Sequence, residues 1–305
     1  MDKLIDEIEK KAKTLEGITK TGRTHLMDAM PVDFSDELLA WSSQLHASRK
    51  MLSVIEERFL ELPQGGTAVG SGINAHKQFS KFFAQELTKL SGNKCKCVPS
   101  GNFFHELSAQ DSSVQLSGEL KNLAVILMKI ANDLRWMNSG PLAGLSEIEL
   151  QALQPGSSIM PGKVNPVIPE AVTMVSADVI GNDASITVAA QAGNFQLNVM
   201  LPVIAYNLLK SINLLAGAMN VLSTKGIKTF KVNKKNLEAS LSRNPILVTA
   251  LNPIIGYEKA AEIAKKAYKS GRPIIEVANE ETDLSVAQLK KLLDPSKLTK
   301  GGISK

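Results

Sequence analysis

The segment FSDELLAWSSQLHASRKMLSVIEERF, residues 34–59, contains a regularly spaced set of side chains that are apolar at all but one position. The set consists of Phe34, Leu38, Trp41, Leu45, Ser48, Leu52, Ile55 and Phe59. Spacings that alternate between four and three residues place these side chains on one face of a helix, as at the a and d positions of a heptad repeat. The pattern therefore predicts a long helix that packs lengthwise in a bundle.

Other parts of the chain have the same helical period of apolar residues. The remaining long or medium helices are predicted over residues 1–15, 77–91, 106–138, 169–192 and 199–222. Residues 17–33, GITKTGRTHLMDAMPVD, contain glycines, threonines and a proline, and we expect a loop there. No convincing strand pattern is present, so the predicted fold class is all-α.

The composition changes beyond Gly226, where the chain becomes more basic and the predicted helices become shorter. Residues 252–278 predict a helix, a glycine stop and a second helix. We therefore expect a long antiparallel helix bundle over residues 1–226 and a small C-terminal helical domain over residues 227–305. Helices of this length expose wide apolar faces, which favours an oligomer whose helices pack across subunits.

The overall composition limits the classes of function. Of the 305 residues, 44% are hydrophobic and 21% are charged, and the net charge is +5. Lysines alternate with acidic residues and no nucleic-acid-binding motif is present, so we expect no nucleic-acid partner. No run of roughly 18 apolar residues is present, so we expect no membrane partner. Cys95 and Cys97 are too close for an unstrained disulfide and too few for a zinc site, which indicates reduced thiols, no metal and a reducing compartment.

A second segment, QPGSSIMPGKVNPVIPEA, residues 154–171, lies between two predicted helices and is rich in polar groups. Its candidate functional side chains are those of Ser157, Ser158, Lys163 and Asn165. The helix that begins near Glu170 directs backbone N–H groups toward the same region. These groups suit a substrate with carboxylates and a step in which negative charge develops on one of them. The alternative is a structural loop whose serines cap helices.

One of the four histidines, His25, lies in a predicted loop beside Thr24, and loops carry functional residues more often than helix faces do. For His46, His76 and His105 we expect structural or surface roles, because nothing near them in the sequence completes a site.

These motifs are those of a known family. GSSIMPGKVNP, residues 156–166, resembles the signature of the fumarase/aspartase superfamily, in the form that class II fumarases and aspartases share. GRTHLMDAMPV, residues 22–32, resembles a second region, in which fumarases have histidine where aspartases usually have glutamine, so His25 favours fumarase. Residues 65–74, 127–141 and 247–267 are also similar, and the resemblance extends through nearly the whole chain.

The resemblance implies a class II fumarate hydratase, a hydro-lyase that reversibly adds water to fumarate to give (S)-malate without metal or other cofactor. In the reverse direction a base removes a proton beside a carboxylate, and hydroxide then leaves with help from an acid. By motif position Ser157 would be the base. The groups that would bind the substrate carboxylate and stabilise the carbanion are Ser158, Lys163 and Asn165.

The second region would supply the remaining groups. Thr24 would bind substrate, and His25 would be a second acid or base that acts through a water molecule. Glu170 would pair with this histidine and raise its proton affinity.

The family has two further regions, a Ser-Ser-Asn-Asp core and an upstream Ser-Gly-Thr stretch, and neither is present here. We therefore expect that the N-terminal part of the family's chain is absent and that a complete site needs it. The resemblance also implies a homotetramer in which several subunits share each site. We expect a cytoplasmic location, with a mitochondrial one left open. The alternatives are aspartate ammonia-lyase, or a non-catalytic helical protein that serves as an assembly scaffold.

Overall fold

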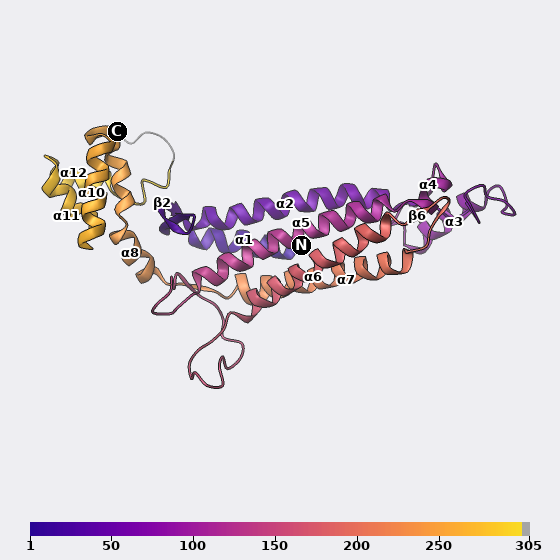
Figure 1. The fold of residues 1–305 in the computed structure, drawn as a ribbon, viewed down its shortest axis with the longest axis horizontal. Helices are drawn as coiled ribbons and strands as arrows, with labels where there is room; N and C mark the ends of the chain where they lie inside the picture. Colours follow the sequence, from indigo (N-terminus) through magenta and orange to yellow (C-terminus); the bar gives the residue numbers. More distant parts are fainter. Residues whose placement is uncertain (301–305) are drawn as a thin grey trace. The chain divides into compact units, whose positions relative to one another are not determined.

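The computed structural model describes residues 1–300 and is predominantly helical (Figure 1). Its long helices are α1 (Asp2–Leu15), α2 (Phe34–Arg58), α5 (Asp111–Met137), α6 (Val167–Ala190) and α7 (Leu201–Val221). The chain forms two compact units. Unit 1 consists of residues 1–5, 43–133 and 167–222, and unit 2 consists of residues 6–42, 134–166 and those from 223 onward.

Unit 1 is a helix bundle in which α6 and α7 pack side by side (Figure 1). Polar side chains join its helices internally. Asn182 Nδ2 donates a hydrogen bond to Ser211 Oγ at 3.1 Å. Asp183 accepts hydrogen bonds from Ser117 at 2.7 Å and from Lys121 at 2.6 Å. The other elements of unit 1 are α3 (Phe79–Leu90), α4 (Phe103–Ser108), β3 (Glu61–Leu62) paired with β4 (Val98–Pro99), and β6 (Gly193–Asn194) paired with β7 (Leu197–Asn198).

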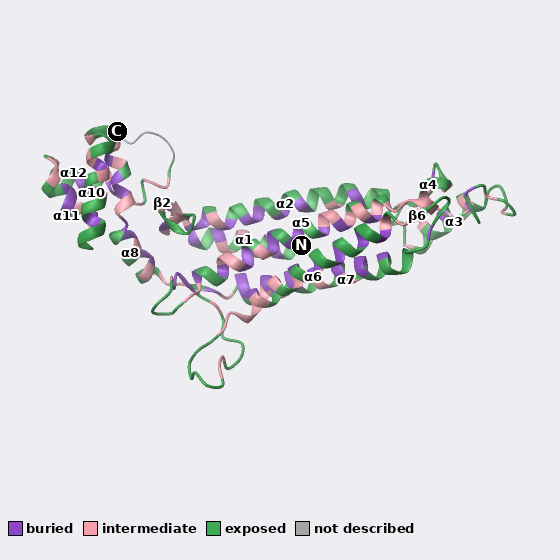
Figure 2. Ribbon diagram, viewed as in Figure 1, coloured by how far each residue is buried: buried purple, intermediate pink, exposed green. Residues whose placement is uncertain are grey.

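Helices α6 and α7 have exposed positions along their length (Figure 2), and several of these positions carry large apolar side chains. The exposed fraction is 70% for Met174, 65% for Tyr206 and 61% for Leu209. Among residues 1–300, Leu201–Ile227 is the one stretch long and apolar enough to cross a membrane by length and composition. A helix of a soluble bundle has the same length and composition, so this stretch does not by itself indicate a membrane protein.

Unit 2 contains the antiparallel hairpin of β1 (Thr19–Thr24) and β2 (Met27–Asp33). Strand β5 (Ile148–Glu149) pairs with β8 (Lys231–Val232). The following helices are α8 (Lys234–Arg243), the 3₁₀ helix η2 (Pro245–Leu251), α9 (Asn252–Ile255), α10 (Tyr257–Ser270), α11 (Ile274–Glu281) and α12 (Val286–Leu292). Residues between Leu247 and Leu293 form a separate apolar cluster in this part of the unit. The expected division of the chain at residue 226 stays a prediction.

The all-α fold and the long helices are confirmed, and the seam of α2 is buried along most of its length. Phe34, Leu38, Trp41 and Leu45 have no exposed surface, whereas Phe59 lies beyond the end of the helix and is 40% exposed. The predicted helix over residues 106–138 is in fact two helices, α4 and α5. They are separated at Ala109, whose extended backbone (φ −107°, ψ 155°) ends the first of them.

The prediction of a loop over residues 17–33 is wrong, because these residues form the hairpin of β1 and β2. The two turn residues, His25 and Leu26, have φ values of 55° and 60°. Positive φ at both central residues is the geometry of a two-residue hairpin turn, which is normally signalled by Asn-Gly or Asp-Gly. A His-Leu pair gives no such signal in the sequence.

The interaction of His105 with Asp111 in unit 1 predicts a pH dependence. His105 Nε2 lies 2.9 Å from Asp111 Oδ2, and this hydrogen bond is the main reason why the pKa of His105 is raised above its ordinary value of 6.5. Because the pKa is higher in the folded state, protonated His105 stabilises the fold below about pH 6.5, and this contribution is lost as pH rises through the raised pKa.

We expect Asp111→Asn to lower the pKa of His105 toward its ordinary value, as measured by NMR titration of the ring protons. Glu106, whose carboxylate lies 3.2 Å from Nδ1, provides the matched comparison. Glu106→Gln should lower the pKa less, since the attraction of Glu106 is a smaller cause of the shift. An unchanged pKa in Asp111→Asn would contradict this account.

Candidate active site

The structure places most of the candidate residues in unit 2. Thr24 ends β1, and His25 is the first residue of the hairpin turn. The candidates Ser157, Ser158, Lys163 and Asn165 lie in the irregular segment between β5 and α6, also in unit 2. Glu170 lies in the first turn of α6, in unit 1. The predicted pairing of Glu170 with His25 therefore stays a prediction.

A buried group of charged residues holds the stem of the hairpin. Arg23 Nη1 donates a hydrogen bond to Glu147 Oε1 at 2.5 Å. Lys20 Nζ lies 2.6 Å from Glu147 Oε2, with the geometry of an ion pair rather than a hydrogen bond, and donates to Glu37 Oε2 at 2.7 Å. Lys20 and Glu147 are only 3% and 2% exposed. We call Lys20, Arg23, Glu37 and Glu147 the stem network.

The segment that contains the serines closes into a loop. A Cβ atom built on Gly156 would lie 1.2 Å from the carbonyl oxygen of Lys163, so the backbone at these two positions is in direct contact. Only glycine fits at position 156, because any other residue would place its Cβ atom in that carbonyl. Gly162, with φ of 84°, makes the turn just before Lys163. We call residues 156–163 the serine loop.

Within the serine loop, the Ser157 hydroxyl oxygen accepts hydrogen bonds from two backbone N–H groups. The donors are Met160 N at 3.1 Å and Ile159 N at 3.3 Å. Donors directed at an oxygen favour its negatively charged form. The local fold of the loop therefore favours negative charge on Ser157 Oγ, which this oxygen needs if it is to remove a proton.

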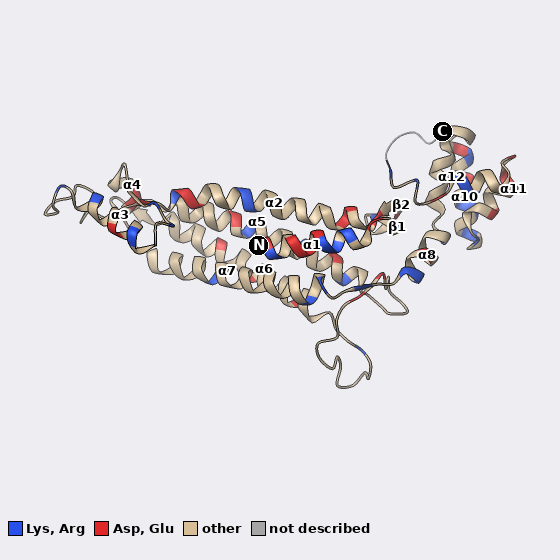
Figure 3. Ribbon diagram, turned by 180° about the vertical axis from the view of Figure 1, so that it is seen from behind, with Lys and Arg blue, Asp and Glu red and all other residues tan. Residues whose placement is uncertain are grey.

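Lys163 is the only charged residue between Gln151 and Pro166, and Figure 3 shows the long segment after α5 as almost free of acidic and basic residues. Its side chain is exposed and makes no ion pair with any residue from 1 to 300. Ser158 is exposed and Asn165 is half-buried. A cation that lacks an acidic partner is available to bind an anionic ligand.

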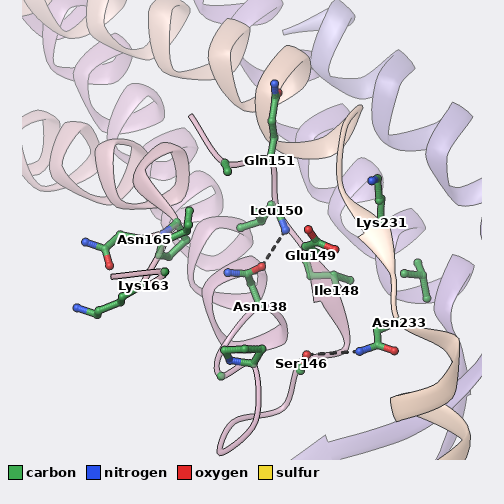
Figure 4. Close-up of a pocket in the computed structure, with 17 residues that line it drawn as sticks. Asn138, Ser146, Ile148, Glu149, Leu150, Gln151, Lys163, Asn165, Lys231 and Asn233 are labelled. Atoms are coloured by element: carbon green, nitrogen blue, oxygen red, sulfur yellow. Dashed lines mark hydrogen bonds between the residues drawn. The ribbon is translucent and has the colours of Figure 1, made fainter. Parts of the chain in front are cut away.

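Lys163 and Asn165 border a pocket of about 590 Å³ in unit 2. Figure 4 shows them on one side of this pocket and Lys231 and Asn233 on the other, with Asn138 between them. Asn138 Oδ1 accepts a hydrogen bond from Leu150 N at 2.8 Å, which fixes the start of the segment that leads to the serine loop. Neither serine of the loop lines this pocket.

Sequence reasoning missed Asn138, Lys231 and Asn233 as pocket residues. The only signal in the sequence is the basic stretch KGIKTFKVNKK, residues 225–235, which contains Lys231 and Asn233 but does not by itself indicate a pocket. The structure brings it to the pocket because β8 pairs with β5, which lies more than eighty residues earlier in the chain. Among residues 1–300 no group of three or more histidine, cysteine, aspartate or glutamate side chains could hold a metal ion.

Two family models match the chain. The model described as Lyase matches residues 1–181, and the one described as Fumarase C C-terminus matches residues 247–300. The chain is 61% identical over 296 residues to a fumarate hydratase class II of Pseudomonas aeruginosa, covering 97% of this chain and 64% of that enzyme. It is 45% identical over 300 residues to the fumarate hydratase class II of Bacillus subtilis, covering 98% of this chain and 64% of that enzyme.

Solved structures give the same result. A class II fumarase from Schistosoma mansoni superposes with a TM-score of 0.94 at 33% identity, over 98% of this chain and 65% of that one. A fumarate lyase:delta crystallin from Brucella melitensis superposes with a TM-score of 0.93 at 41% identity, over 98% and 65%. The chain thus spans about 64% of the length of its curated relatives. On these matches the chain belongs to the fumarase/aspartase superfamily of lyases, among the class II fumarases.

Proposed function

We propose that this chain carries out the reversible hydration of fumarate to (S)-malate as part of a class II fumarate hydratase. The observation that carries the proposal is the closed serine loop, in which two backbone N–H groups point at Ser157 Oγ. The named relatives of this chain are fumarate hydratases, which supports the same assignment.

In the direction of dehydration, Ser157 Oγ would take the proton from the carbon next to a malate carboxylate. The electron pair left on that carbon moves into the carboxylate, which then carries two negative charges. Lys163 and the amide of Asn165 would stabilise this charge together with the hydroxyl of Ser158. The two N–H donors to Ser157 would offset the weakness of a serine hydroxyl as a base.

The hydroxide that leaves from the neighbouring carbon needs a proton. His25 would supply it through a water molecule, with Thr24 bound to the substrate and Glu170 paired to the histidine. The tight turn at His25 and Leu26 exposes the imidazole ring at the tip of a rigid hairpin. An exposed ring at the end of a two-stranded stem can meet a substrate held by another part of the assembly.

The complete enzyme would need more than this chain. The curated relatives are longer, since the chain covers 62–64% of them, and the family resemblance assigns a third conserved region to the part that has no counterpart here. We propose that this region completes the site. We also propose a homotetramer, in which the apolar sides of α6 and α7 are covered by other copies, and a cytoplasmic location. No metal or other cofactor takes part in the proposed reaction.

The first prediction concerns the activity itself. With malate as substrate, the absorbance of the fumarate double bond should rise for the chain alone or after addition of the missing segment of a relative. Ser157→Ala should lower kcat by about 10²–10⁴-fold, the usual contribution of a general base. Ammonia release from aspartate would instead indicate aspartate ammonia-lyase. If a folded, assembled protein releases neither product, the scaffold alternative holds.

Gly156→Ala tests the closure of the serine loop. The added methyl group would collide with the Lys163 carbonyl, so the loop must open and Ser157 must move away from Lys163. We expect a loss of activity of about 10²-fold, comparable to a displacement on the order of 1 Å in an active site. The thermal unfolding midpoint should change little, because the loop is exposed. Gly101→Ala, at an exposed glycine outside α6 and α7 whose added Cβ meets nothing within 4 Å, is the matched control and should retain activity.

The proposed assembly can be measured by size-exclusion chromatography with light scattering. We expect four chains per particle, and Leu209→Asp should produce smaller particles, because a carboxylate would be buried against apolar side chains of another copy. Leu90→Asp is the control, since Leu90 is 84% exposed at the end of α3, away from the apolar sides of α6 and α7. A chain that stays monomeric at all concentrations would contradict the tetramer.

A further inference from the structure

We propose that Glu147 is a positioning residue that fixes the hairpin bearing Thr24 and His25 to the same frame from which the serine loop departs. The inference rests on the proposed function for its catalytic meaning, although its structural part does not. Glu147 lies outside both signature motifs, and it precedes the serine loop by only nine residues.

The backbone of Glu147 is held from two directions. Its N–H donates a hydrogen bond to Met137 O, at the end of α5, at 2.8 Å, and its carbonyl accepts one from Asn233 N at 2.8 Å. Directly after it, β5 pairs with β8. The carboxylate therefore extends from a fixed point of unit 2, and a group bound to it is held at that point.

The groups bound to this carboxylate belong to the hairpin. Arg23 contacts Oε1 at 2.5 Å and Lys20 contacts Oε2 at 2.6 Å, so both oxygens are used. Arg23 is separated from His25 by Thr24 alone. Glu147 thus restrains Arg23, which directly precedes Thr24 and His25, the two residues that the proposed mechanism uses.

The other partners of Lys20 and Arg23 indicate which part of the hairpin would move if Glu147 lost its charge. Lys20 keeps a second carboxylate, Glu37, at 2.7 Å, and lies 4.7 Å from the centre of the Phe34 ring. Arg23 keeps two weaker partners, the exposed Asp28, with Nε to Oδ1 at 3.8 Å, and the Thr21 carbonyl oxygen, which accepts a hydrogen bond from Nη1 at 3.5 Å. When Glu147 loses its charge, the base of the hairpin should stay in place through Lys20, while its tip loosens through Arg23.

Hydrogen–deuterium exchange and NMR of Glu147→Gln test the structural part. Glutamine keeps one oxygen that can accept from Arg23 but lacks the negative charge, and loss of this charge should make opening of the hairpin tip roughly ten- to a hundredfold more frequent. Exchange at residues 23–28 should rise accordingly, and the ring resonance of His25, assigned with His25→Asn, should shift or broaden. Exchange in α10 should not change. Glu147→Asp, which restores the charge on a shorter side chain, should recover part of the protection.

The control is Leu289→Ala, which removes a fully buried side chain from the apolar cluster of the same unit. It should destabilise α10 to α12 without raising exchange at residues 23–28. If Glu147→Gln leaves the hairpin as protected as in the wild type, or if Leu289→Ala loosens the tip equally, the positioning role is overturned.

Activity gives the second measurement, in whichever form of the protein proves active. Glu147→Gln should lower kcat by about 10²-fold with a smaller change in KM, since His25 acts on the leaving hydroxide and misplacement on the order of 1 Å has that cost. Leu289→Ala, assayed well below its unfolding temperature, should keep its kcat. If the wild type has no hydratase activity while Glu147→Gln still loosens the hairpin, the proposed function is refuted and the anchoring role stands. An unchanged kcat in a hydratase-active Glu147→Gln protein would refute the positioning role.

Discussion

The carboxylate of Glu147 is the interaction that joins the hairpin of unit 2 to the segment that leads to the serine loop. Its two oxygens are buried and face two cations, one of which also contacts Glu37. Removal of ions from water is costly, so a buried network of this kind adds little net stability compared with apolar residues of the same volume. Loss of Glu147 should cost less than the about 3–5 kcal/mol of a broken buried pair, because Lys20 keeps Glu37 and Arg23 keeps Asp28.

The stem network joins three segments of the chain in one arrangement. Its members come from β1, from the first turn of α2 and from the segment between α5 and β5. In the observed placement of these three segments every charge of the network has a partner, and Glu147 lies where the chain leaves for the serine loop. The two family motifs are more than a hundred residues apart in sequence, and one buried carboxylate relates them in space.

Patterns within a short window of sequence predicted the helices well. The seam from Phe34 to Leu45 could be predicted because the local period alone decides which side chains share one face of a helix. The hairpin was missed because Thr19–Thr24 is polar on both faces and its turn lacks Asn-Gly. No local pattern could show that Lys20 and Glu147 are buried, since each is expected at the surface until its distant partner is known.

For the serine loop, too, the sequence indicated which residues are functional candidates but not how the loop is folded. Ser157, Lys163 and Asn165 were predicted as functional from their chemistry and from the family resemblance, and their roles stay predictions. The contact of Gly156 with the Lys163 carbonyl was not predictable, because it depends on how the loop crosses itself. Likewise Asn233 reaches the pocket only through the pairing of β5 with β8.

Helices α6 and α7 bury several polar side chains and expose several apolar ones. Ser176, Asn182 and Asp183 are buried between helices, whereas Met174 and Tyr206 face outward. The buried polar groups are satisfied by hydrogen bonds, and one between helices, from Asn182 Nδ2 to Ser211 Oγ at 3.1 Å, helps to fix the register of α6 against α7 at little cost. The outward apolar side chains have no such compensation within unit 1. Burial of apolar area stabilises by roughly 25 cal/mol per Å², so the outer sides of these helices favour contact with another apolar surface over contact with water, as the proposed tetramer would provide. In the proposed tetramer, the same association would bring together site residues of several copies, so that assembly of the site and burial of the outer sides of α6 and α7 would be two results of one association.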